Sequence, residues 1–160
     1  LGIGQVMLMG DLGDVYNNGL GLDFQYRFDA SELFGLVAHL TYSGHSDNND
    51  YNTMSIFGAT PDLLVNFAYI DKLILYGFTG FGLFKVSQTF EKKDYGVLTI
   101  GFNAGAGFNL ALAPNFQFGT SIGFWNLLSK TDTVTINGIS TNRDVGGTFL
   151  SLMLNVYYLF

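Results

Sequence analysis

The sequence has no cysteine, only two prolines and few charged residues. Charged side chains make up 12% of the 160 residues, roughly half the share of an ordinary soluble domain. Without cysteine the fold has no disulfides, so rigidity must come from packing or from a closed ladder of backbone hydrogen bonds. Only seven Lys and Arg, scattered among 13 Asp and Glu, give a formal net charge of −6. That balance excludes the basic patch of a nucleic-acid-binding protein.

A membrane-spanning helix is also missing from the pattern. The longest uncharged stretch, residues 95–129, is long enough for one. Polar residues or glycine recur at every second position of its first half, however, and Pro114-Asn115 interrupts it. A helix would spread those residues around its circumference, whereas a strand places them on one face. The chain starts at Leu1 without a basic, then apolar, leader, so we expect a mature or trimmed form.

The residues that are abundant favour β-structure in contact with lipid. Apolar residues reach 48%, aromatic residues reach 16%, and there are 21 glycines. The length predicts a single domain over residues 1–160. Composition alone leaves a soluble β-protein rich in hydrophobic residues as an alternative.

The last segment has the clearest pattern. Its even positions are all apolar and end on aromatics, and its odd positions carry the polar groups. In a membrane barrel the first face contacts lipid and the second faces the lumen. The even positions form a predicted assembly signal, comprising Leu152, Leu154, Val156, Tyr158 and Phe160.

Four more segments alternate with the same period of two, around residues 20–28, 34–42, 98–112 and 116–128. Three others are less clear. Residues 3–9 are compatible with either facing. Residues 57–69 are predicted to point Leu63, Val65, Phe67 and Tyr69 outward. Residues 73–86 are predicted to point Ile74, Tyr76, Phe78, Phe84 and Val86 outward and Lys85 inward.

The connections between these eight segments alternate between long and short. The long ones are residues 10–19, 44–53, 87–96 and 129–147, and the short ones lie at 29–32, 71–72 and 114–115. Outer-membrane barrels have short periplasmic turns and longer extracellular loops, so both termini are predicted to be periplasmic. A soluble barrel has no reason to alternate in this way. The sequence therefore predicts an all-β, eight-stranded, antiparallel, up-and-down transmembrane barrel.

A barrel of this size holds side chains and little else, so we expect a polar and largely plugged lumen. Opposite charges and amide hydrogen bonds would make the buried polar groups tolerable. The predicted lumen network consists of Asp23, Gln25, Arg27, His39, Asp62, Asn66, Lys85, Asn103 and Gln117.

Two glycine-rich segments, residues 75–82 (LYGFTGFG) and 101–108 (GFNAGAGF), resemble strands of the OmpA/OmpX-like superfamily of small outer-membrane β-barrels. Ala113-Pro114-Asn115 at the next turn and the terminal Phe160 are similar to that superfamily as well. The resemblance covers the whole chain and implies a cell outer-membrane location and insertion by the barrel-assembly machinery. Residues 119–124 depart from the common acidic, tyrosine-rich pattern, which keeps an OmpW-like small-solute channel as an alternative.

Chemistry-bearing motifs are few. His39 has Thr41 and Ser43 nearby, and His45 is followed by Ser46 and Asp47, but a nucleophile, a base and an acid must converge for catalysis. The acidic run at residues 47–50 lacks the spacing of a calcium loop. Residues 91–94 (EKKD) are a candidate contact for lipopolysaccharide phosphates. No metal, cofactor or catalytic residue is predicted.

The leading hypothesis is a non-enzymatic outer-membrane protein with a structural or surface-interaction role, with specificity in its loops. Its expected partners are outer-membrane lipid, lipopolysaccharide and proteins that bind the loops or form a larger complex. The alternatives are a narrow channel or transporter for small solutes, hydrophobic ones among them, and, third, a lipid-modifying enzyme.

Overall fold

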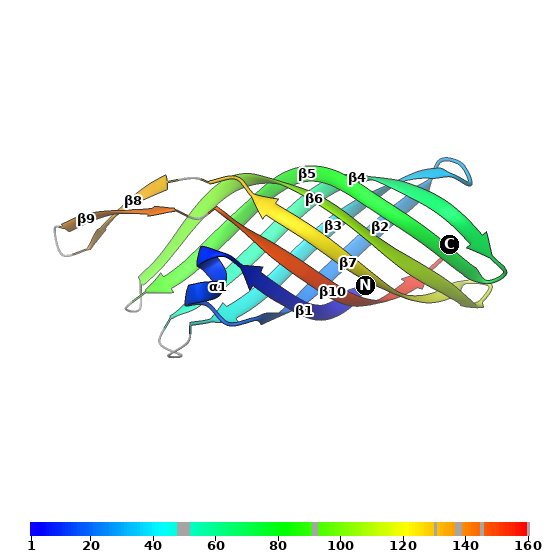
Figure 1. Ribbon diagram of the computed structural model, residues 1–160, viewed down its shortest axis with the longest axis horizontal. Coiled ribbons are helices and arrows are strands. Elements are labelled where there is room, and N and C mark those ends of the chain that lie inside the picture. The colour runs from blue at the N-terminus through cyan, green and yellow to red at the C-terminus, as the bar shows by residue number, and fades with distance from the viewer. Residues whose placement is uncertain (48–51, 91–92, 130, 137–138, 145, 160) are drawn as a thin grey trace.

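The computed structural model of residues 1–160 is described for all positions except 48–51, 91–92, 130, 137–138, 145 and 160. Eight antiparallel strands close into a barrel in the order β1-β10-β7-β6-β5-β4-β3-β2 (Figure 1). Their bounds are β1 Gly2–Met9, β2 Gly19–Asp29, β3 Phe34–Ser46, β4 Thr53–Ile70, β5 Leu73–Phe90, β6 Lys93–Ala113, β7 Phe116–Leu127 and β10 Gly147–Tyr158. The predicted eight-stranded antiparallel barrel is confirmed.

The two ends of the barrel differ. At one end, here called the turn end, short turns follow β2, β4 and β6. In the turn after β4, Asp71 adopts a left-handed backbone with φ of 55°, a conformation that Asp tolerates better than most residues. At the other end, the loop end, the first connection contains the helix α1 (Asp11–Val15), and the last contains the hairpin of β8 (Thr131–Ile136) and β9 (Ile139–Asp144).

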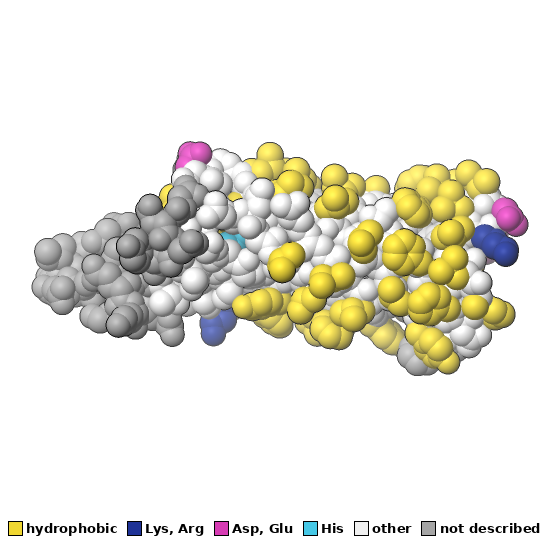
Figure 2. Space-filling model, turned by 90° about the horizontal axis from the view of Figure 1, so that it is seen from below, with side chains coloured by type: hydrophobic (Ala, Val, Ile, Leu, Met, Phe, Trp, Pro, Cys, Tyr) yellow, Lys and Arg dark blue, Asp and Glu magenta, His cyan; other side chains and the backbone are white. Residues whose placement is uncertain are grey.

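The outer wall carries the apolar faces that the period of two predicts. Leu152, Leu154, Val156 and Tyr158 of β10 are exposed, while Ser151, Met153, Asn155 and Tyr157 are buried. The same alternation confirms the predicted faces of β2, β3, β4, β6 and β7. On the face shown in Figure 2, hydrophobic side chains cover the middle of the barrel and the charged ones lie toward its ends. Among the described residues, no helix has the length and apolar character needed to cross a membrane.

The predicted facing of the fifth strand is wrong. Tyr76, Phe78, Phe84 and Val86 point into the barrel, and Lys85 is exposed on the outer wall. Both faces of β5 are rich in apolar residues, so alternation alone does not distinguish them. The neighbouring strand decides the facing, because β6 presents glycines inward. A Cβ at Gly105 would overlap the Phe78 ring, so the large rings of β5 fill the space that β6 leaves.

The long loop predicted at residues 87–96 is also wrong. Pairing of β5 with β6 continues to Phe90 and Lys93, past the point where the apolar alternation ends. Polar residues can continue a ladder of backbone hydrogen bonds as long as both strands remain paired. The point where the apolar alternation of β5 and β6 stops is therefore the edge of the apolar band. It is not the end of the strands, which extend beyond that band.

Candidate functional site in the barrel lumen

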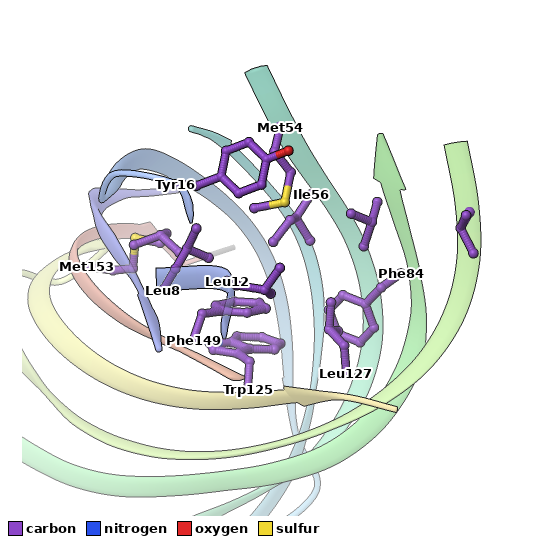
Figure 3. Close-up of a cluster of buried hydrophobic side chains, with 13 residues drawn as sticks. Leu8, Leu12, Tyr16, Met54, Ile56, Phe84, Trp125, Leu127, Phe149 and Met153 are labelled. Carbon is purple, nitrogen blue, oxygen red and sulfur yellow. The ribbon is translucent and has the colours of Figure 1, made fainter. Parts of the chain in front are cut away.

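An apolar cluster fills the loop-end half of the lumen (Figure 3). Side chains from the barrel strands meet two residues of the first connection, Leu12 from α1 and Tyr16 just after it. Trp125 stacks on Phe149 with ring centroids 5.8 Å apart and 7° between the planes. The cluster comprises Val6, Leu8, Leu12, Tyr16, Met54, Ile56, Phe84, Val86, Val97, Trp125, Leu127, Phe149 and Met153.

Below this cluster lies a row of three ionisable side chains. His39 on β3 stands between two carboxylates, with Nδ1 3.0 Å from Asp23 Oδ2 and Nε2 3.6 Å from Asp62 Oδ2. All three side chains are buried. Asp62 and Asn103 face each other across Gly80, which pairs with both in the register. The missing side chain at Gly80 lets Asn103 Nδ2 donate to Asp62 Oδ2.

Hydrogen bonds extend this row toward the turn end. Gln25 Nε2 donates to Asp23 Oδ2 at 2.6 Å, and its Oε1 accepts from the Tyr157 hydroxyl at 2.7 Å. The Tyr157 and Tyr76 hydroxyls are 3.3 Å apart. Asn155 Nδ2 donates to Ser121 Oγ at 2.9 Å. Strands far apart in sequence are joined through the lumen, as buried polar groups require.

Arg27 forms the turn-end part of this network. It donates to Asp29 Oδ1 at 2.9 Å and to Asn66 Oδ1 at 2.6 Å, and its guanidinium lies 5.6 Å from the centroid of the Tyr76 ring. A cavity of about 390 Å³ opens beside it, with Gln25, Arg27, Gln117 and Tyr157 in its lining. The lumen is therefore polar and partly open at the turn end, and apolar at the loop end.

A serine–histidine pair lies near the loop end. Ser43 Oγ is 3.0 Å from His45 Nε2, and His45 Nδ1 is 3.0 Å from the carbonyl oxygen of Asn17. This arrangement has a hydroxyl and a base, as nucleophilic catalysis needs. Both side chains are buried, however, and the pocket beside Ser43 has a volume of only about 20 Å³. That space holds about one water molecule and no acyl chain.

Eight of the nine predicted lumen residues lie inside the barrel, and Lys85 does not. Asp23, His39, Asp62 and Asn103 meet at the centre, joined by Gln25, whereas Arg27 and Asn66 lie nearer the turn end. Gln117 lines the turn-end cavity without joining the centre. In the assembly signal, Leu152, Leu154, Val156 and Tyr158 face outward, and Phe160 lies outside the described residues.

Sequence reasoning missed the apolar cluster. The signal was present in the period of two, because inward positions continue from Gly123 to Trp125 and Leu127 and from Ser151 back to Phe149. The two loop residues had no such signal. Leu12 and Tyr16 are recruited from outside the strand pattern, so only their position over the barrel shows that they are core residues.

A groove of about 730 Å³ lies on the outer wall of β3, β4 and β5 at the loop end. Lys85 pairs in register with Phe57, which pairs with Tyr42, so the lysine is level with the last apolar side chains of these strands. Beyond that level the lining is rich in hydroxyl groups, from Ser46, Thr53, Ser55, Ser87 and Thr89.

No family model and no curated protein matches the sequence. Solved structures match the fold. Neisserial surface protein A aligns over 99% of this chain and 94% of its own at 12% identity, with a TM-score of 0.72. Ail of Yersinia pestis, in complex with the heparin analogue sucrose octasulfate, aligns over 98% and 94% at 17% identity, with a TM-score of 0.56. The outer membrane protease OmpT of Escherichia coli aligns over 91% and 65% at 11% identity, with a TM-score of 0.50.

Proposed function

Starting from the fold of the small outer-membrane β-barrels, which this chain has, we propose that it is a non-conducting outer-membrane protein with a structural or surface-interaction role. Its turn end, with both termini, faces the periplasm, and its loop end faces the cell exterior. The apolar cluster carries this proposal. It closes the lumen with packed aromatic and aliphatic side chains, and α1 adds Leu12 from above. A packed apolar layer has neither the water nor the polar lining that ions need to pass.

The first prediction concerns conductance. Purified barrel added to a planar lipid bilayer is expected to insert without stepwise current, because the apolar cluster blocks the loop-end half of the lumen. A solute-uptake assay in proteoliposomes is expected to give the same result for small polar solutes. A persistent conductance of defined size would overturn the proposal of a plugged lumen and would favour a narrow channel instead.

The loop end supports a surface-interaction role. Figure 1 shows the hairpin of β8 and β9 extending beyond the barrel, where its two strands pair only with each other. An exposed two-stranded sheet offers free backbone edges to a partner. The sequence outside the membrane band at this end is not basic, since the connections carry more Asp and Glu than Lys and Arg. We therefore favour a protein partner over a sulfated sugar such as the heparin analogue in the Ail complex.

Catalysis is not part of the proposal, although the fold also occurs in a protease. The Ser43–His45 pair is buried beside a pocket of about 20 Å³, so a lipid or peptide substrate has no access to the hydroxyl. His39 lies deeper, between two carboxylates, and among the described residues no hydroxyl group is hydrogen-bonded to it.

The outer-wall groove is the proposed contact for anionic lipid of the outer leaflet. Lys85 stands at the edge of the apolar band, where lipid phosphates lie, and the hydroxyl groups above it suit sugar and phosphate oxygens. Lys85→Glu is expected to lower the amount of phosphorylated glycolipid retained by the purified barrel severalfold, measured by native mass spectrometry. Lys72→Glu at the turn end is the matched control and should retain as much as the wild type. If both variants retain the same amount of glycolipid, the outer-wall groove is not the binding site.

A further inference from the structure

Four neighbouring polar side chains at the centre of the lumen, below the apolar cluster, each have one buried atom without a hydrogen-bond partner. Within the described residues, His39 Nε2, Thr60 Oγ1, Asp62 Oδ1 and Asn103 Oδ1 are buried and form no hydrogen bond. His39 and Thr60 are cross-strand partners, and Asp62 and Asn103 meet across Gly80. Buried polar atoms are normally satisfied, so unsatisfied atoms on four neighbouring side chains point to a ligand.

The tautomer of His39 determines what kind of ligand fits. Asp23 is a carboxylate and only accepts hydrogen bonds, so Nδ1 of His39 carries the hydrogen of that contact. In the neutral ring, Nε2 then directs a lone pair toward the second carboxylate, Asp62. Two electron-rich atoms face each other there, and only a positive species between them makes the arrangement favourable.

The distance favours a metal ion over a proton. His39 Nε2 and Asp62 Oδ2 are 3.6 Å apart, too far for a direct N–H···O hydrogen bond. Two ligands at tetrahedral positions around a zinc-like ion, with bonds of about 2.1 Å, lie about 3.4 Å from each other. The observed separation is close to that value. The Asp23–His39 hydrogen bond also reproduces the carboxylate–histidine pair that orients metal-ligating imidazoles.

The charges of the lumen side chains also favour a metal cation as the ligand. Asp23 and Asp62 bring two negative charges into the lumen, and Arg27 is engaged with Asp29 and Asn66 instead. A divalent cation bound by neutral His39 would balance both carboxylates. The imidazole ligand selects a first-row transition ion or Zn²⁺ over Ca²⁺ or Mg²⁺.

We propose that the centre of the lumen is a binding site for a divalent transition-metal ion, held by His39, Asp62, Asn103 and Thr60 and oriented by Asp23. Within the described residues no three His, Cys, Asp or Glu side chains surround one point, because Asp23 lies on the other side of the imidazole. The site is therefore weaker than a three-histidine zinc site. Gln25 lies between the site and the turn-end cavity, since it lines that cavity and donates to Asp23.

The single tryptophan of the chain provides the assay. Trp125 lies 6.1 Å from His39 between ring centroids, so Cu²⁺ or Ni²⁺ at the site is expected to quench its fluorescence. Titration of the full barrel in detergent, with metal added both after folding and during refolding, should give saturable quenching at one ion per chain. Zn²⁺, which does not quench, should reverse it by competition.

Two variants of the proposed ligands, with a third variant as a control, test whether the metal binds at this site. His39→Gln and Asp62→Asn should each weaken binding by tenfold or more, whereas His45→Gln should bind like the wild type. Folding of each variant is verified by its heat-dependent migration on gels. Absence of saturable quenching under both loading conditions would overturn the proposal. So would equal quenching in His39→Gln, which would assign the metal to an adventitious surface site, or full affinity in Asp62→Asn.

Discussion

Arginine in place of Leu154 is expected to destabilise the barrel by about 2–4 kcal/mol, because a cation on the lipid face near the bilayer midplane is costly. Leu154 is 55% exposed on the outer wall and pairs with Ile3 and Thr120 on the neighbouring strands. Its side chain therefore projects from the outer wall toward lipid, with the two paired strands on either side of its backbone. The measurement is the free energy of unfolding in lipid vesicles, titrated with urea or guanidinium chloride.

Tyr158→Arg is the matched control. Tyr158 is on the same face of β10 but at the end of the strand, where an arginine side chain reaches the interface and costs about 0–1 kcal/mol. A smaller loss at Tyr158 than at Leu154 would show that depth in lipid sets the cost. Equal stability of Leu154→Arg and the wild type would mean that this face does not contact lipid.

Truncation of Trp125 to alanine should cost about 3–5 kcal/mol, the usual range for removing a large buried aromatic side chain. The side chain stacks on Phe149, meets Phe84 edge to face at 6.0 Å between ring centroids, and donates from Nε1 to Ser151 Oγ at 2.8 Å. All three contacts disappear in the variant, and a cavity forms within the apolar cluster. Because the variant has no tryptophan, circular dichroism or gel migration replaces fluorescence in the denaturation experiment.

A double variant that includes Trp125→Ala tests whether the apolar cluster is the barrier to ion flow. If the cluster alone closes the lumen, Trp125→Ala combined with Phe149→Ala should allow transient currents that the wild type lacks. Phe124→Ala is the matched control, because Phe124 directly precedes Trp125 on β7 but faces outward. It should lose little stability and stay electrically silent. A wild-type free energy of unfolding for Trp125→Ala would show that the cluster is not a packed core.

The outer wall was predictable residue by residue in every strand except β1 and β5. A bilayer favours apolar side chains at the positions that face it, so the lipid faces of β2, β3, β6, β7 and β10 show a period of two in the sequence. The same requirement limits the number of strands and the positions of the tight turns at residues 71–72 and 114–115. Strand ends were less predictable, because β5 and β6 remain paired beyond the apolar band.

The lumen was predictable only in its composition. The sequence indicates that Asp23, His39 and Asp62 point inward, since each belongs to a strand with an apolar outer face. It does not show that the three align in one row, because their spacing depends on which strands are neighbours and in which register. Nor does it place Lys85, because both faces of β5 are apolar and the glycines of the neighbouring β6 decide which face points inward.

The sequence by itself determined that this chain is a closed barrel with an apolar outer wall. Few charges, no cysteine and a period of two are local properties, and lipid acts on each side chain separately. Tertiary structure alone decided what fills the interior. Closure of the barrel brings β2, β3, β4 and β6 around one axis, so that two carboxylates meet one imidazole and Leu12 of α1 joins the same apolar cluster as Trp125. Those contacts join residues far apart in the chain, and no local pattern records them.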